Sequence, residues 1–303
     1  MKRRDFLKGC LACGATASVC GMSKKAWSAG SFEGYPEAMG VLVDLTRCIG
    51  CRSCEAACNK EQKLPEPTTS FADQSVFSEK RRPTEYAYTV VNKYDTQKGP
   101  VFRKIQCNHC NEPACLTSCF VNAYTKTKEG AVTYNGKICV GCRNCMIACP
   151  FNVPGYSYSS AFNALVKKCI FCHETRLKEG NPPACVEVCP QEVLTFGYRK
   201  DLIKMAHERI REMPDKYIDH VYGEKEVGGT GWIYLSGVTF DQVGFDTTLG
   251  NEPIISNVKE FLGTVPMVLS IWPALFTGFH LLATKNKGHH DDHSNSHQED
   301  SHK

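Results

Sequence analysis

The sequence predicts an α+β protein with a loop-rich body of two pseudo-symmetric halves and one C-terminal transmembrane helix. Three observations predict this fold: a repeated cysteine pattern through the middle of the chain, a basic N-terminus followed by a weakly apolar stretch, and a long uncharged segment near the C-terminus. The chain has 303 residues, 42% of them hydrophobic and 22% charged. This length is enough for one large or two modest domains with packed cores.

Residues 1–29 are predicted to be a twin-arginine signal peptide that is removed from the mature protein. Lys2, Arg3 and Arg4 begin a basic region, a short weakly apolar stretch follows, and small residues end the segment. The segment has six Lys and Arg against one Asp, whereas the whole chain has a net charge of +4, so the remainder carries −1. A nearly neutral body argues against a nucleic-acid binder.

A membrane-spanning helix is predicted over 261–284, because Phe261 to Thr284 contains no Lys, Arg, Asp or Glu. A helix of this length would span roughly 36 Å, which exceeds a hydrocarbon core of about 30 Å. A buried core helix is the alternative. The positive charges just after the span favour a cytoplasmic C-terminus, and residues 285–303 are predicted to be a disordered cytoplasmic tail.

Sixteen of the nineteen cysteines form four quartets, and the other three fall in the predicted signal peptide. The quartets are, in chain order, Cys48, Cys51, Cys54 and Cys58; Cys107, Cys110, Cys115 and Cys119; Cys139, Cys142, Cys145 and Cys149; and Cys169, Cys172, Cys185 and Cys189. The first and third quartets have the same spacing, whereas the second and fourth have a wider gap before a Pro-Ala-Cys. The body is therefore an internal repeat of two alternating units.

This spacing favours [4Fe–4S] clusters as the cofactors. A cluster of four irons needs one thiolate for each iron; three closely spaced cysteines can bind one side, and the fourth can serve a neighbouring cluster. Gly50 and Gly141 let the backbone approach the cluster closely. Structural zinc usually takes two Cys-x2–4-Cys pairs, which runs of three cysteines do not match. Disulfides suit an exported protein, but four matching quartets would then be a coincidence.

Residues 44–200 resemble the four-cluster ferredoxin-like electron-transfer subunits of bacterial membrane-bound oxidoreductases, because they contain the four quartets. The two ends of the chain and the stretches 222–230 and 235–238 resemble the iron–sulfur subunit of the hydrogenase-2 type and of the high-molecular-weight cytochrome complex. The resemblance implies two ferredoxin-like halves with four [4Fe–4S] clusters. The domain would cover 30–200, and a membrane-proximal extension would cover 201–260, with a strand near 231–238.

The resemblance also implies how the quartets exchange their fourth cysteines. The four ligand sets are named here A (Cys48, Cys51, Cys54, Cys189), B (Cys58, Cys169, Cys172, Cys185), C (Cys107, Cys110, Cys115, Cys149) and D (Cys119, Cys139, Cys142, Cys145). Spacing alone does not give this nested order, because neighbouring quartets could equally well exchange their fourth cysteines with each other. Asn59 and Phe120 stand where a ferredoxin motif prefers proline, and this departure predicts a small change of backbone without loss of a cluster.

Histidine and tyrosine side chains give weaker signals. His109 and His173 lie beside quartet cysteines and could tune a cluster by bonding to sulfur, although we expect both to be solvated. His280 lies in the predicted span and could contact a haem or quinone, but its place near the end favours the membrane interface. The alternation from Tyr86 to Tyr94 predicts a strand, which is either partner-facing or part of the core.

No Ser–His–Asp set, phosphate loop, paired-acid site or dinucleotide fingerprint stands out, so we expect an electron-transfer subunit with no catalytic residues of its own. The resemblance implies a relay between a periplasmic hydrogenase or multihaem cytochrome c and a quinone-reactive subunit of the inner membrane, with the iron–sulfur domain in the periplasm. Three alternatives are an iron–sulfur subunit of a molybdopterin oxidoreductase, an enzyme with a cluster as its active centre, and a multi-zinc structural adaptor. The complete quartets speak against the second alternative.

Overall fold

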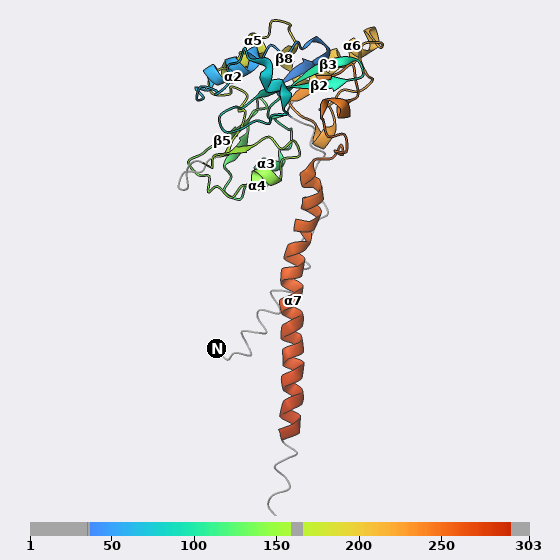
Figure 1. Ribbon diagram of the computed structural model, residues 1–303. Helices are drawn as coiled ribbons and strands as arrows, with labels where there is room; N and C mark the ends of the chain where they lie inside the picture. Colours follow the sequence, from blue (N-terminus) through green and yellow to red (C-terminus); the bar gives the residue numbers. More distant parts are fainter. Residues whose placement is uncertain (1–34, 36, 159–165, 292–303) are drawn as a thin grey trace, which may run out of the picture. The chain divides into compact units, whose positions relative to one another are not determined.

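The computed structural model shows a body of short helices and small sheets joined by long loops (Figure 1). The structure describes residues 35, 37–158 and 166–291. The predicted signal peptide and the last residues of the predicted tail, 292–303, lie outside the described residues. Every element below belongs to the compact unit that begins at Glu37. The α+β, loop-rich class is therefore confirmed.

Nine strands and six α-helices are formed within the described ranges. The strands are β1 (Met39–Asp44), β2 (Val90–Thr96), β3 (Gly99–Ile105), β4 (Tyr124–Lys126), β5 (Val132–Tyr134), β6 (Gly155–Tyr156), β7 (Val166–Lys167), β8 (Leu194–Tyr198) and β9 (Trp232–Leu235). The α-helices are α2 (Ser53–Glu61), α3 (Ala114–Thr117), α4 (Asn144–Ile147), α5 (Ala184–Glu187), α6 (Arg199–Glu212) and α7 (Ile254–Asp291). Short 3₁₀ helices are η1 (Leu45–Arg47), η2 (Gln74–Ser78), η3 (Leu177–Glu179), η4 (Glu226–Gly228) and η5 (Phe240–Val243).

Strand β1 is the centre of a three-stranded sheet in the order β8-β1-β9. Its sequence is a nearly continuous apolar run, as expected for a strand covered on both faces. It pairs with β8 in the antiparallel and with β9 in the parallel direction. Strand β9 confirms the strand predicted near 231–238. The remaining strands form three separate antiparallel pairs, β2–β3, β4–β5 and β6–β7.

Two hydrophobic cores lie on opposite faces of this sheet, because neighbouring residues of a strand point in opposite directions. Leu42 of β1 and Ile233 of β9 pack with the buried face of α6. On the other face, Val41 and Val43 join an aromatic core. Its buried aromatic members are Phe171, Tyr222, Trp232, Tyr234, Phe240 and Phe245.

The predicted strand from Tyr86 to Tyr94 is partly wrong in its bounds. Strand β2 begins at Val90 and continues to Thr96, because an isolated bridge between Thr84 and Ala87 turns the chain just before it. Tyr86 is exposed in front of the strand, whereas Tyr94 packs against the aromatic core. The core interpretation therefore fits Tyr94 and does not fit Tyr86.

The alternating repeat of the sequence is also visible in the backbone. Helices α2 and α4 follow Arg52 and Arg143, which both have the left-handed conformation, with φ of 61° and 64°. Helices α3 and α5 instead follow the prolines of the two Pro-Ala-Cys motifs, Pro113 and Pro183. Equivalent cysteines are thus presented by equivalent local structures.

The segment predicted to span a membrane is helical, but the helix is longer than predicted. Helix α7 includes all of 261–284 and appears as one continuous element in Figure 1. Residues 285–291, predicted to be disordered, belong to it, since lysine is a good helix former and does not end the helix. In the part of the chain that the structure describes, no helix is long and apolar enough to cross a membrane. The membrane crossing is therefore not confirmed.

Replacement of Gly50 by alanine is expected to destabilise the protein. Gly50 has a φ of +71°, and an added Cβ would lie 2.4 Å from the ring of Phe102. Gly180 is a matched control, because its φ is +77° and nothing lies within 4 Å of the added atom. Both variants lose about 1–2 kcal/mol from the left-handed backbone, and Gly50→Ala loses about 1–3 kcal/mol more from overpacking. Equal thermal unfolding midpoints would contradict this expectation.

Candidate iron–sulfur centres

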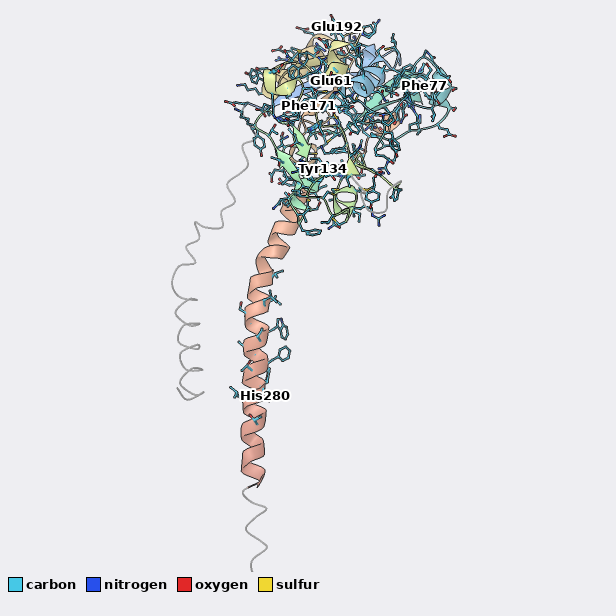
Figure 2. The ribbon with its side chains drawn as sticks, turned by 90° about the vertical axis from the view of Figure 1, so that its left-hand side faces the viewer. Glu61, Phe77, Tyr134, Phe171, Glu192 and His280 are labelled. Carbon is cyan, nitrogen blue, oxygen red and sulfur yellow. The ribbon has the colours of Figure 1, made fainter. Side chains whose placement is uncertain are left out.

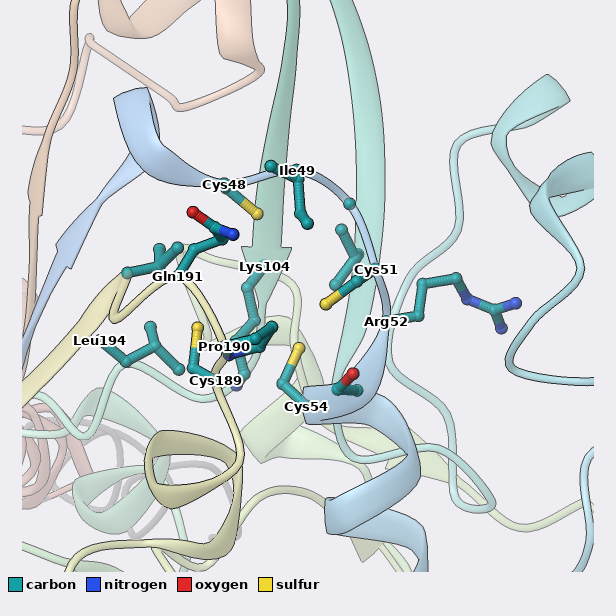
Figure 3. A pocket seen from close by; sticks show the side chains of 14 residues that line it. Cys48, Ile49, Cys51, Arg52, Cys54, Lys104, Cys189, Pro190, Gln191 and Leu194 are labelled. Carbon is teal, nitrogen blue, oxygen red and sulfur yellow. The ribbon is translucent and has the colours of Figure 1, made fainter.

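The four thiols of set A surround one cavity. Cys48, Cys51 and Cys54 come from the loop between η1 and the first turn of α2, and Cys189 follows α5. Figure 3 shows their four sulfur atoms directed toward a common space. The side chain of Lys104, from β3, reaches into the same space. Set A was expected from the resemblance, and the structure brings its members together.

The loop of set A is fixed by a buried arginine. The guanidinium of Arg52 points away from the sulfur atoms (Figure 3) and donates to Glu55 at 3.0 Å. It also donates to the carbonyls of Ser70 and Asp73, at 2.9 and 2.8 Å. Glu55 accepts a further bond from the Val91 amide at 2.6 Å. These bonds connect the cysteine loop to two distant segments, so the positions of the thiols depend on tertiary structure.

The thiols of set C line a second cavity. Its lining includes Cys107, Cys110, Cys115, Cys149 and the side chain of Lys168. Cys115 lies in α3, which starts directly after Pro113, and Cys149 of the third quartet follows α4. A cysteine of one quartet therefore joins three cysteines of another, as in set A.

The members of set B are electrostatic neighbours of one another. Burial first, and then the thiols of Cys169, Cys185 and Cys172, raise the pKa of Cys58 well above its usual value. The side-chain amide of Gln62, just after α2, donates to the sulfur of Cys172 at 3.7 Å. A donor aimed at a ligand sulfur stabilises negative charge there.

The thiols of set D are also electrostatic neighbours of one another. Burial raises the pKa of Cys145, and the neighbouring thiols of Cys139, Cys142 and Cys119 contribute to the increase. The backbone amide of Ala123 donates to the sulfur of Cys119 at 3.2 Å. Cys142 is exposed, whereas Cys145 and Cys119 are buried.

The sixteen cysteines in the described residues are all free thiols. Among these residues, no group of three or more His, Cys, Asp or Glu side chains is placed to hold a single metal ion. Burial raises the pKa of Cys48 to about 11 and the pKa of both Cys115 and Cys169 to about 12. Binding of iron must therefore displace protons from these thiols.

His109 is buried, so the expectation that it is solvated was wrong. Its side chain is fully covered and stacks on Phe171, with ring centroids 4.9 Å apart. Its Nδ1 accepts the backbone N–H of Val132 at 2.9 Å. Burial and the nearby Lys168 hold the pKa of His109 well below 6.5, so the ring is neutral. His109 is thus a packing residue that connects β5 to the aromatic core.

His173 was also expected to be solvated, and it is instead only 6% exposed. Its Nε2 lies 3.3 Å from Glu129 and its Nδ1 lies 3.0 Å from Glu174. Glu129 is far from His173 in the sequence, so the quartet motif gave no sign of this contact. His280 lies on α7 with an exposed side chain (Figure 2).

Sequence reasoning missed two buried lysines beside the thiols. Lys104 is 4% exposed and Lys168 is 2% exposed, and each lines one of the two cavities. A signal was present in the sequence, because each lysine lies within three residues before the first cysteine of a quartet. Lysine is almost never fully buried unless it is paired.

Replacement of His109 by phenylalanine is expected to lower the free energy of unfolding by about 1–3 kcal/mol, because the buried N–H of Val132 loses its acceptor. The aromatic stacking on Phe171 is retained in this variant. His207→Phe is the control, since His207 is 47% exposed on α6 and its contact with Glu224, at 2.9 Å, lies at the surface, so its loss is expected to cost less than about 1 kcal/mol. Similar unfolding midpoints for both variants would show that the Val132 bond is unimportant.

Comparison with known proteins defines the class of this chain. The family model for a 4Fe–4S dicluster domain matches residues 100–199. A protein of Nitratidesulfovibrio vulgaris is 53% identical over 290 residues, which cover 95% of this chain and 78% of that protein. The hydrogenase-2 operon protein HybA of Escherichia coli O157:H7 is 34% identical over 274 residues, which cover 80% of this chain and 83% of HybA. The iron–sulfur subunit of the nitrate-inducible formate dehydrogenase of Escherichia coli K12 is 28% identical over 276 residues, 88% of this chain and 92% of that subunit.

The chain is an iron–sulfur protein of the ferredoxin-like class. It belongs to the family of 4Fe–4S electron-transfer subunits of oxidoreductases that includes HybA. Its cofactors are four [4Fe–4S] clusters. The donor set fits this group, because four cysteine side chains line each of two shared cavities.

Proposed function

We propose that the chain relays electrons one at a time through four clusters within a membrane-bound periplasmic oxidoreductase complex. The observation that carries this proposal is a succession of neighbouring thiols from one set to the next. Cys54 of set A is an electrostatic neighbour of Cys185 of set B, Cys169 of set B is a neighbour of Cys107 of set C, and Cys115 of set C is a neighbour of Cys145 of set D. These neighbours support one line of centres in the order A, B, C, D.

The sixteen cysteines are proposed as the iron ligands, in the four sets A to D. The cavities support sets A and C, and the electrostatic neighbours support sets B and D. With this exchange of fourth cysteines, A and B form one double-cluster half, and C and D form the other. The alternating helix starts described above support this pseudo-symmetry.

The contribution of the protein to the transfer is to fix and enclose the centres. When bound, a [4Fe–4S] cluster accepts or donates one electron. The loop bonds of Arg52 and Glu55 hold the sulfurs of set A in place. Six of the sixteen thiols are buried, and they belong to sets B, C and D, so the protein limits the access of water to these centres. A relay of this kind requires no substrate pocket, and we propose no catalytic residue for this chain.

The two ends of the line are proposed as the contact points for redox partners. Cys51 of set A and Cys142 of set D are the exposed thiols of the described part. Ile49 beside Cys51 is 54% exposed, and Val140 beside Cys142 is 61% exposed. Exposed apolar side chains of this kind favour protein docking. One partner would be a periplasmic hydrogenase or multihaem cytochrome c, and the other a quinone-reactive membrane subunit.

We further propose that the iron–sulfur domain lies in the periplasm and that the protein is anchored in the inner membrane. The twin-arginine pattern supports export, and residues 201–260 would then lead toward the membrane. Leu269, Phe276 and Phe279 of α7 are exposed apolar side chains, and lipid would cover them. We propose a single C-terminal anchor at 261–284, which the uncharged run of the sequence supports, with the polar tail in the cytoplasm.

A second candidate is the iron–sulfur subunit of a molybdopterin oxidoreductase. Two relatives favour it, the formate dehydrogenase subunit and a subunit of the anaerobic dimethyl sulfoxide reductase of Escherichia coli K12. The latter is 36% identical over 172 residues, which cover 54% of this chain and 76% of that subunit. Purification of the tagged protein from detergent-solubilised membranes distinguishes the two candidates. A hydrogenase or cytochrome co-purifies under the first proposal, and a molybdopterin protein under the second.

Metal analysis tests the proposed cofactor content. The native protein, purified without oxygen, is expected to contain close to sixteen irons per chain with an equal amount of sulfide, because each of sixteen thiols binds one iron. Zinc without sulfide would contradict the relay and favour the multi-zinc adaptor. Spectroscopic titration showing fewer than four clusters would contradict the sixteen ligand assignments.

The exchanged pairing is tested by removing single ligands. Cys51→Ala and Cys189→Ala are expected to abolish the same electron paramagnetic resonance signal, because both belong to set A. Cys58→Ala is the matched control and should abolish a different signal, that of set B. Pairing within the first quartet predicts the opposite result, in which Cys51→Ala and Cys58→Ala abolish the same signal.

The export signal is tested by replacing Arg3 and Arg4 together with lysine. This change keeps the positive charge of the region but removes the paired arginines, so the tagged protein is expected to accumulate in the cytoplasm. Lys8→Arg is the control, and its export should be normal. Periplasmic protein at the normal level in the double variant would refute twin-arginine export.

A further inference from the structure

Each of the two thiol-lined cavities contains one buried lysine. Lys104 lines the cavity of set A, and Lys168 lines the cavity of set C. Figure 3 shows the contrast with the other cation at the first cavity, since Lys104 lies among the sulfurs while the guanidinium of Arg52 points away. The two lysines come from different parts of the chain, β3 and the residue after β7.

Lys104 is held in place by uncharged groups. Its ammonium donates to the side-chain oxygen of Gln106 at 3.1 Å and lies 4.5 Å from the centroid of the Trp232 ring. Gln106 in turn donates to the hydroxyl of Tyr234 at 2.7 Å, and that hydroxyl donates to Asn108 at 3.1 Å. These side chains are all buried. The series of bonds fixes the ammonium without neutralising it.

Lys168 is also held by uncharged groups. Its ammonium donates to the backbone carbonyl of Val132 at 2.5 Å and to the carbonyl of Cys169 at 3.0 Å. Lys126 is a third lysine near set C, but its ammonium donates to the carbonyls of three residues, His109, Cys110 and Gly130, and is not part of the cavity lining.

Neither Lys104 nor Lys168 has a carboxylate at ion-pair distance among the residues that the structure describes. A buried charge without a counter-charge is very costly. The thiols that neighbour Lys104 belong to sets A and B, and those that neighbour Lys168 belong to sets C and B. The negative charge of the loaded centres is therefore the counter-charge of both lysines.

We propose that Lys104 and Lys168 are fixed positive charges that raise the reduction potentials of the clusters on either side of them. Lys104 acts on the clusters of sets A and B, and Lys168 on those of sets B and C. Reduction adds one electron to a cluster without forming or breaking a bond, so a nearby cation stabilises the reduced form. Both lysines are positioning residues, and the inference rests on the ligand sets proposed above.

The experiment compares Lys104→Met and Lys168→Met in the complete, cluster-loaded protein, using redox titration of the four electron paramagnetic resonance signals. Each variant is expected to make two of the four clusters harder to reduce, by at least about tenfold in the equilibrium constant, or about 59 mV for one electron. One signal, that of set B, should shift in both variants. Lys93→Met is the control, because Lys93 lies on the neighbouring strand β2 and its side chain is 38% exposed.

Four outcomes are decisive. Unchanged potentials in both methionine variants, with all irons present, would overturn the inference and leave the relay proposal intact. The inference would also be overturned if all four signals shift in one variant, or if no signal shifts in both variants. If Lys104→Met loses a cluster, the variants Lys104→Gln and Lys104→Arg are compared instead. Lower reduction potentials in the glutamine variant, together with near-normal potentials in the arginine variant, support the fixed charge. A wild-type protein with fewer than four clusters would instead reject the proposed function.

Discussion

Four sulfur atoms must meet at one cavity although they come from segments far apart in the chain, and much of the fold serves this requirement. Strand β1 and strand β8 pair in antiparallel register, and the Asp44 amide bonds to the carbonyl of Val193 at 2.8 Å just beyond that pairing. Cys48 follows this end of β1, and Cys189 precedes this end of β8. The central sheet therefore brings together the two parts of set A that spacing in the sequence separates.

The quartet spacing predicted the kind of site because the ligands of a cluster leave a strong local pattern, in which close cysteines and the following helix turn recur. The family, the cofactors and the loop-rich α+β class could all be predicted from it. The strand over Trp232–Leu235 was also predictable, since its apolar run follows a glycine. Which quartet donates its fourth cysteine to which neighbour depended on resemblance, because spacing contains no information on how the repeats pack.

Burial could not be predicted where distant segments cause it. His109 is covered by Phe171 and bonded by the Val132 amide, and Lys104 lies against Trp232 from the other end of the body. Neither neighbour is close in sequence, so the polar residues resembled solvated ones. The predicted end of the C-terminal helix was wrong for a different reason. Charged residues end an apolar run, but lysine has a high helix propensity, so the helix continues beyond that run.

The placement of β1 between β8 and β9 has a consequence for biosynthesis. Strand β1, which is synthesised first, needs partners that are synthesised about 150 and 190 residues later, at Leu194–Tyr198 and Trp232–Leu235. Closing such long loops has an entropic cost that must be met before the pairing stabilises the protein. The central sheet therefore cannot be completed before the segment that ends at Leu235 has been synthesised. A product truncated before Trp232 leaves the parallel edge of β1 unpaired.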